Sequence, residues 1–209
     1  MNNRKKLPPL GATERIELSI SYVLKAIILF TIVMSFVEFN LFFVATSLVI
    51  LVFSARPAMV KHTFRITMPV EVDLVLTTFI FAHFILGEVG NYYNKFWFFD
   101  LILHSSSGIL IGMAGFIIMY FFLYSSRVSA NPLLVSVLCV TFSLALGAIW
   151  EIFEFGMDQL FGFAMQKNGN VDTMSDLIVD LLGACVVGFW VYRYLKKNED
   201  GLVKLMINR

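Results

Sequence analysis

Two neighbouring stretches decide how this chain folds: Trp150-Glu-Ile-Phe-Glu-Phe-Gly-Met-Asp158 and Asp172-Thr-Met-Ser-Asp-Leu-Ile-Val-Asp180-Leu-Leu-Gly-Ala184. They hold six carboxylates, and Lys167 is the only basic residue between their outer ends. The segments that flank them, residues 132–149 and 181–190, are almost wholly apolar. Carboxylates within or beside hydrocarbon are costly unless they are paired, protonated or bound to a cation. Because one lysine cannot pair with six acids, the sequence predicts a polar site inside an apolar protein.

The composition places the chain among membrane proteins. Hydrophobic residues make up 58% of its 209 positions and charged residues 15%, and the mean hydropathy is +0.79. Soluble domains carry about a quarter charged residues. Several apolar runs are long enough to cross a bilayer as helices. The sequence therefore predicts an all-α, polytopic transmembrane bundle. It has no basic stripe interleaved with aromatic residues, so nucleic acid is not an expected partner.

Six membrane spans are predicted. They cover about residues 18–37, 41–55, 72–86, 98–124, 132–155 and 176–195. An aromatic loop, 87–99, precedes the fourth span, and a polar loop, 156–175, separates the last two. The domain organisation is then a basic cytoplasmic tail at 1–17, one six-span membrane domain at 18–195 and a second basic cytoplasmic tail at 196–209.

The basic residues predict the orientation of these spans. With the N-terminus inside, thirteen of the sixteen lysines and arginines fall in cytoplasmic segments, only Lys95 and Lys167 fall outside, and Lys25 lies within the first span. Such an excess is the positive-inside pattern of polytopic membrane proteins. It predicts that both termini are cytoplasmic.

This topology brings polar residues from four spans to one membrane depth, near the outer face. Helical spacing adds that several of them share faces, since residues three or four apart are neighbours on a helix surface. Such stripes on apolar helices are satisfied by facing one another or a water-filled cavity, so we expect spans four to six to pack around a common site. The residues concerned are His83, Glu88, Asp100, His104, Glu151, Glu154, Asp158, Asp172, Asp176 and Asp180.

A carboxylate-rich cavity with an imidazole suits a divalent metal ion, which is the cofactor we predict. A water bound to that metal would be activated for attack on a phosphate or ester, with an uncoordinated carboxylate, Asp158 or Glu88, as acid or base. The predicted metal ligands are Asp100, His104, Glu151, Glu154, Asp172, Asp176 and Asp180.

Several of these side chains also suit roles that need no metal. Asp172 and Asp176 lie near a helix start, where carboxylates cap amides and complement the helix dipole. Glu151 and Glu154 can reach the interface by extending along the helix, and a lone His83 is more often an interior hydrogen-bonded histidine than a ligand. For the whole cluster the alternatives to a metal site are a proton-carrying network and purely structural polarity.

Three motifs resemble a known family. Asp100-x-x-x-His104, Trp150-Glu-x-x-Glu154 and Asp172-Thr-x-x-Asp176-x-x-x-Asp180-x-x-Gly-Ala184 resemble the YjdF-type family of bacterial inner-membrane proteins, which has no assigned function. More distantly, the second half is similar to VanZ-like proteins, one of which is associated with glycopeptide resistance. Glu154 and Asp180 stand where that pattern has glutamine and asparagine, and the arginine expected before Asp172 is missing.

The resemblance implies a multi-pass protein of the cytoplasmic (inner) membrane. The residues favour a metal-dependent enzyme acting on a lipid or lipid-linked envelope substrate, with the bilayer as its partner. The alternative is a non-enzymatic VanZ-like envelope or resistance protein, or a transporter coupled to cations or protons. The sequence leaves the oligomeric state open.

Overall fold

The computed structural model describes residues 11–37, 70–126, 130–167 and 169–197. Every regular element within these ranges is a helix, and they contain no strand. Contacts divide the chain into two compact units, residues 1–95 and 96–209, which we treat separately. The predicted second span, residues 41–55, lies outside the described residues.

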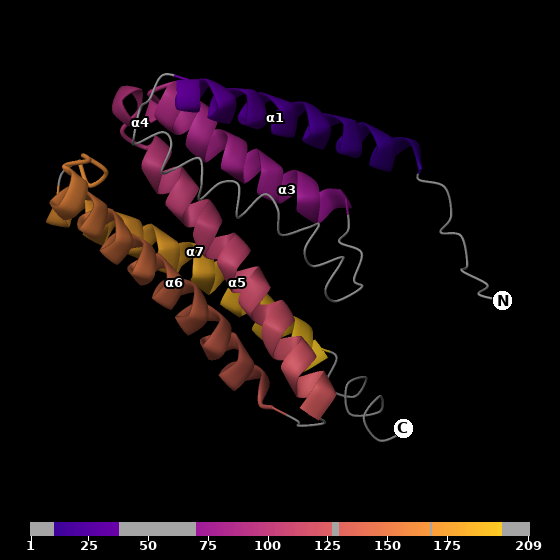
Figure 1. Cartoon of the computed structure of the whole chain (residues 1–209). Helices are drawn as coiled ribbons and strands as arrows, with labels where there is room; N and C mark the ends of the chain where they lie inside the picture. Colours follow the sequence, from indigo (N-terminus) through magenta and orange to yellow (C-terminus); the bar gives the residue numbers. More distant parts are fainter. Residues whose placement is uncertain (1–10, 38–69, 127–129, 168, 198–209) are drawn as a thin grey trace. The chain divides into compact units, whose positions relative to one another are not determined.

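The first unit pairs two long apolar helices. Helix α1 (Ala12–Val37) packs against α3 (Val70–Phe81), and both are labelled in Figure 1. The buried side chains of Ile28, Ile32 and Phe84 form its apolar core. Helix α1 begins six residues before the predicted start of the first span, so part of the predicted tail 1–17 is helical.

A π-helix follows α3 directly. This element, η1 (Ala82–Val89), extends the predicted third span by three residues, and the short helix α4 (Tyr92–Lys95) comes next. The prediction of a loop over residues 87–99 was therefore wrong for much of that segment. The ring of Tyr93 lies where a side chain on Gly87 would point, and the Tyr93 hydroxyl contacts Nδ1 of His83 at 2.5 Å. This tight packing folds the aromatic segment back onto η1.

The second unit is a bundle of three long helices. Helices α5 (Phe99–Ser126), α6 (Pro132–Phe161) and α7 (Asn170–Lys197) pack against one another in all three pairs (Figure 1). This confirms the prediction that the last three spans pack together. Part of their apolar core surrounds Phe116, Cys139 and Val191. Ser143 Oγ also donates to the Gly108 carbonyl oxygen at 2.8 Å, which links α6 to α5.

The ends of α6 follow from local sequence. The Asn131 side chain accepts a hydrogen bond from Leu133 N at 2.8 Å, and Pro132 occupies the first turn, where its missing N–H is not needed. Gly162 ends the helix in the left-handed conformation, with φ 70°. The predicted polar loop 156–175 was too long at both ends, because α6 continues to Phe161 and α7 begins at Asn170.

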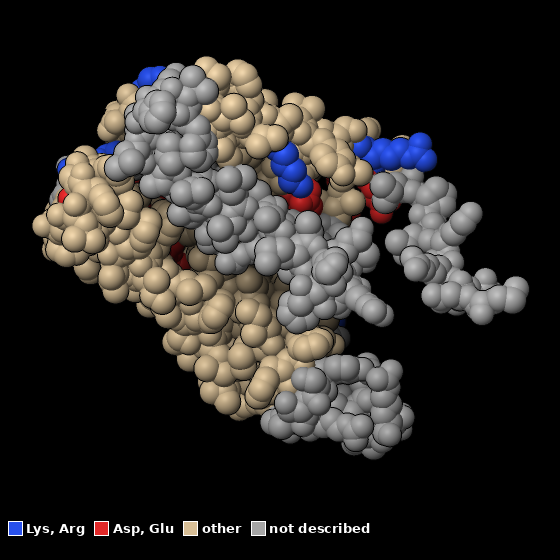
Figure 2. Space-filling model, viewed as in Figure 1, with Lys and Arg blue, Asp and Glu red and all other residues tan. Residues whose placement is uncertain are grey.

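The described helices suit a bilayer. Five of them are long and apolar enough to cross a membrane: Ala12–Met34, Val70–Val89, Phe99–Leu123, Pro132–Phe161 and Asn170–Lys197. Many large apolar side chains on their surfaces are exposed, and acidic and basic side chains occupy little of the face in Figure 2. Such a surface is stable against lipid tails and not in water. The fold is that of a multi-pass membrane protein.

Candidate metal centre

His104 is the centre of the polar cluster in the second unit. It lies on α5 one helical turn after Asp100, and its Nε2 is 3.8 Å from Asp100 Oδ1. Only 9% of His104 is exposed. The predicted sharing of one helix face by this pair is therefore confirmed.

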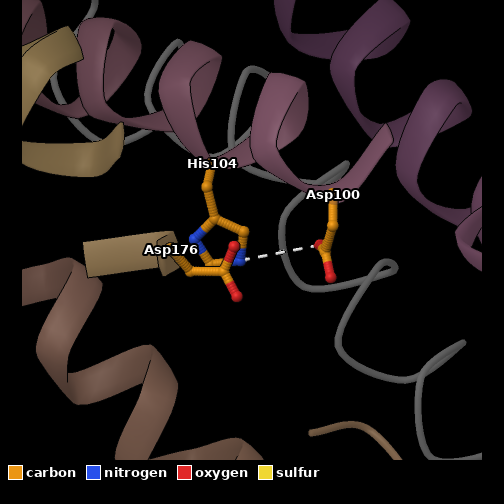
Figure 3. A group of neighbouring side chains, drawn as sticks. All are labelled: Asp100, His104 and Asp176. Carbon is orange, nitrogen blue, oxygen red and sulfur yellow. Dashed lines mark ion pairs between the residues drawn. The ribbon is translucent and has the colours of Figure 1, made fainter. Parts of the chain in front are cut away.

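Asp176 reaches the same point from α7. Ligand atoms of Asp100, His104 and Asp176 all lie within 4.8 Å of one another. Figure 3 shows both carboxylates directed toward the His104 imidazole. Asp176 is 2% exposed, so its carboxylate is removed from solvent.

Asp180, one turn further along α7, approaches the other side of the imidazole. Its Oδ2 is 3.4 Å from Nδ1 of His104, and its Oδ1 accepts a hydrogen bond from Ser107 Oγ at 3.0 Å. A side chain on Gly147 of α6 would collide with the Asp180 carboxylate, and one on Gly108 of α5 with the Asp180 backbone. Two glycines thus allow α5 and α6 to approach α7 where the aspartate is buried.

Glu151 completes the cluster from α6. Its Oε1 lies 3.9 Å from Nε2 of His104, and the residue is 4% exposed. This Oε1 is buried and has no hydrogen-bond partner. The other oxygen, Oε2, accepts from Gln166 Nε2 at 3.4 Å. An unpartnered carboxylate oxygen in an apolar interior is costly, so it marks a position where a donor or cation fits.

Three other predicted site residues have contacts of a different kind. Glu154 accepts a hydrogen bond from Trp150 Nε1 at 2.9 Å, one turn back on the same helix. Asp158 accepts from the backbone amides of Met165 and Gln166, and Asp172 from that of Lys167 at 3.0 Å. The hydrogen bond from Lys167 N is of the kind expected if Asp172 caps backbone amides near the start of α7. Metal ligation by Glu154 and Asp172 stays a prediction, as does proton transfer by Asp158.

His83 and Glu88 belong to the first unit. His83 contacts the Tyr93 hydroxyl, and the two rings meet edge to face with centroids 5.7 Å apart. The contact with Tyr93 is of the kind expected of a hydrogen-bonded histidine, and a ligand role for His83 stays an untested alternative. Glu88 lies in η1, and its role as acid or base stays a prediction.

Comparison with known proteins gives the family. Residues 20–197 match the family described as "Predicted membrane protein (DUF2238)". The chain belongs to this family. A Thermotoga maritima protein named only "Uncharacterized protein" is 33% identical over 132 residues, which cover 60% of this chain. The match covers 64% of that relative, slightly less than two thirds of its length. No solved structure matches the chain. The family thus supplies membrane location and no reaction.

The sequence did not single out three residues of this family member's cluster. Ser107, Gly147 and Gln166 all touch or make room for its carboxylates. Ser107 and Gly147 carried a usable signal, because each lies three or four residues from a predicted ligand and so shares its helix face. Gln166 carried none, since its contact depends on how the loop folds back.

A half-buried charge pair in the first unit was also missed. Lys25 Nζ contacts both carboxylate oxygens of Asp73, at 2.7 and 2.6 Å. Ser21 Oγ donates to the same carboxylate at 2.6 Å and lies 3.3 Å from Thr77 Oγ1. The signal was the isolated lysine inside an apolar run, which requires an acidic partner.

Proposed function

We propose that the second unit binds one divalent metal ion between α5, α6 and α7. The unpartnered Oε1 of Glu151, buried beside His104, carries the proposal. Asp100 and Asp176 add two carboxylates at the same place. The ion pairs within the described cluster join its acids to His104, which can carry one positive charge at most. A divalent cation would supply the missing charge.

The spacing of the ligand atoms fits this proposal. Metal–nitrogen and metal–oxygen bonds of about 2.1 Å place two ligands of one tetrahedral ion roughly 3.4 Å apart. The Nε2 of His104 is 3.8 Å from Asp100 and 3.9 Å from Glu151. These contacts are too long for hydrogen bonds, and each would have to shorten by about half an ångström to reach the spacing of two ligands of one ion. Three carboxylates and one imidazole suit Mn, Fe or Zn better than Mg or Ca.

Asp180 has a different role in the proposed centre. A metal-bound histidine usually donates its other ring N–H to a carboxylate, which fixes the tautomer and the ring orientation. Asp180 lies at Nδ1, on the opposite side of the ring from Asp100 and Glu151. It would hold the proton there and leave the Nε2 lone pair for the metal. The Ser107 hydroxyl holds its second oxygen.

We further propose that the protein is a metal-dependent enzyme acting on a lipid or lipid-linked substrate. His104 lies five residues inside α5, Asp176 six inside α7 and Glu151 ten before the end of α6. At 1.5 Å per residue these positions are roughly 8–15 Å from the helix ends. The exposed Phe96, Trp97 and Phe98 precede α5, and such aromatic residues favour the membrane–water interface. We place a site at this depth near the level of the lipid headgroups, which supports a lipid-linked substrate.

In that chemistry a divalent metal would activate a bound water for attack on a phosphate or ester. The protein's own residues would orient His104, exclude bulk water by the close packing of the three helices and take up the proton at a carboxylate. Asp158 is the predicted candidate for that last role within this unit, and Glu88, the other predicted candidate, lies in the first unit.

Elemental analysis of the detergent-purified protein tests the metal proposal. Wild type is expected to carry about one transition metal per chain, and Glu151→Gln and Asp176→Asn are expected to lose it. Glu71→Gln makes the same substitution at an exposed carboxylate of α3 and is the matched control. Wild type without metal, after purification free of chelator and after reloading, would reject the proposal.

A proton-carrying network is the second candidate. The observation in its favour is that both nitrogens of His104 face carboxylates, an arrangement that suits an imidazolium. Reconstitution into vesicles loaded with a pH-sensitive dye separates the two functions. Metal-free protein that dissipates a pH gradient, with the activity lost in His104→Ala, would favour the transporter.

We also propose the finer relationships and topology that the motifs suggest. These are membership of the YjdF-type group, a distant VanZ-like relation, six spans with both termini cytoplasmic and location in the inner membrane. Supporting them are the three carboxylate motifs and the distribution of lysine and arginine. A reporter active only outside the cytoplasm, fused within residues 162–170, is expected to be active, and an inactive fusion would reverse the orientation.

A further inference from the structure

The segment that joins α6 to α7 folds back onto the end of α6. Asp158 anchors it, because Oδ1 accepts from Met165 N at 2.8 Å and Oδ2 from Gln166 N at 2.9 Å. Both oxygens of one carboxylate thus hold two successive amides. Charge-assisted hydrogen bonds of this kind are shorter and stronger than neutral ones. The backbone at Gln166 is therefore fixed relative to α6.

This anchoring directs the Gln166 side chain inward. Its Nε2 donates to Thr173 Oγ1 at 2.8 Å and lies 3.3 Å from the Glu151 carbonyl oxygen and 3.4 Å from Glu151 Oε2. A glutamine amide has two N–H donors and no charge. One residue of the segment therefore contacts α7 and both the backbone and the carboxylate of Glu151.

The two oxygens of Glu151 differ as a result. Oε2 has a donor in Gln166, whereas Oε1 has no partner and lies on the His104 side. A carboxylate free to rotate would present either oxygen to the cluster. The two oxygens are chemically equivalent, so the Gln166 amide fixes the plane of the carboxylate: with one oxygen held by Gln166, the other faces His104.

We infer that Gln166 is a positioning residue that turns Oε1 of Glu151 toward the bound metal, and that Asp158 holds Gln166 in place for this purpose. The inference rests on the proposed metal centre. It gives the segment between α6 and α7 a role in metal affinity. It also accounts for the placement of Asp158, a carboxylate of the acidic stretch that lies outside the group around His104.

Metal titration of chelator-treated, full-length protein in detergent tests this, with Co²⁺ as the probe. Gln166→Met keeps the side-chain length and removes the amide, and is expected to weaken Co²⁺ affinity by about 10- to 100-fold, as is usual when a residue that orients a ligand is lost. Asp158→Asn is expected to act in the same direction. Gln159→Met makes the same substitution at an exposed position of α6 and should bind as wild type does.

Two further readouts separate positioning from a merely structural role. The visible absorption spectrum of bound Co²⁺ should change in Gln166→Met, because Glu151 coordinates differently, and should not change in Gln159→Met. The melting temperature of the metal-free protein should be similar in both variants.

Wild-type affinity and spectrum in Gln166→Met would overturn the inference and leave the metal centre intact. Weakened affinity with a wild-type spectrum and a lower metal-free melting temperature would reduce Gln166 to a structural residue. Wild type that binds no Co²⁺ would reject both proposals.

Discussion

The two units accommodate charge among apolar helices in opposite ways. In the first unit, one lysine meets one aspartate, with Lys25 Nζ at 2.7 and 2.6 Å from the two oxygens of Asp73. In the second, His104 is surrounded by Asp100, Glu151 and Asp180 at 3.4 to 3.9 Å. The first set of charges is balanced and in contact, whereas the second is acidic and spread out. The difference indicates that the first pair fastens two helices and the second leaves room for an ion.

Breaking the balanced pair is expected to have the largest effect. Lys25→Met leaves the Asp73 carboxylate among apolar helices with Ser21 as its hydrogen-bond donor. Removing one partner of a buried pair costs about 3–5 kcal/mol, and we expect about 3 kcal/mol here because Lys25 is partly exposed. Denaturant unfolding in detergent measures this. The double variant Lys25→Met/Asp73→Leu should recover most of the loss, and a double variant as unstable as Lys25→Met would contradict a simple ion pair.

Added transition metal should raise the free energy of unfolding through the acidic cluster around His104 and not through the Lys25–Asp73 pair. A ligand that binds only the folded state at 100 times its Kd stabilises that state by about 2.7 kcal/mol. Wild type should gain about this much with excess transition metal, and Glu151→Gln should gain nothing. Comparison of unfolding curves in metal and in chelator provides the measurement. An equal gain in both proteins would place the metal elsewhere.

A methyl group added beside the Asp180 carboxylate should lower the free energy of unfolding by a smaller amount. Gly147→Ala puts a methyl group against the Asp180 carboxylate, and overpacking of this kind costs about 1–3 kcal/mol. Gly156→Ala is the matched control on the same helix, because nothing lies within 4 Å of its added methyl. The control should gain up to about 1 kcal/mol from helix propensity. Equal changes in both variants would show that the glycine does not serve the carboxylate.

The smallest effect is expected at Ser107. Ser107→Ala removes the hydrogen bond to Asp180 and should lower the free energy of unfolding by about 1 kcal/mol. It should also weaken metal binding, since Asp180 loses one of its two contacts in the cluster. Ser106→Ala is the control, because its hydroxyl bonds only to the Ile102 carbonyl oxygen of its own helix. A metal affinity that is unchanged in Ser107→Ala would remove Asp180 from the orienting role.

The convergence of the last three helices was predictable from periodicity. The spacing of Asp100 with His104, and of Asp176 with Asp180, puts each pair on one face of a helix that is otherwise apolar. Topology then brings these faces together, and the packing of α5, α6 and α7 confirms it. The cost of isolated charge in an apolar protein is what makes this prediction reliable.

Details set by tertiary packing were not predictable. Spacing alone does not say which imidazole nitrogen faces Asp180, because that depends on the ring rotation fixed by neighbouring helices. Nor does it reveal the partner of Lys25, whose contact Asp73 lies 48 residues away. The predicted end of the fifth span, residue 155, was also too early. Helix α6 continues through Gly156 and ends at Gly162, which adopts the left-handed conformation. The inward contact of Gln166 depends on two backbone hydrogen bonds to Asp158.

Anomalous diffraction at a transition-metal absorption edge, from crystals of the wild-type protein grown with the metal, tests the proposed centre most directly. We expect one strong peak within bonding distance of His104 Nε2, the carboxylates of Asp100 and Asp176, and the unpartnered Oε1 of Glu151. Asp180 should stay on Nδ1, outside the coordination shell. A map with no peak among these residues, or with a metal bound only elsewhere in the protein, would contradict the metal centre.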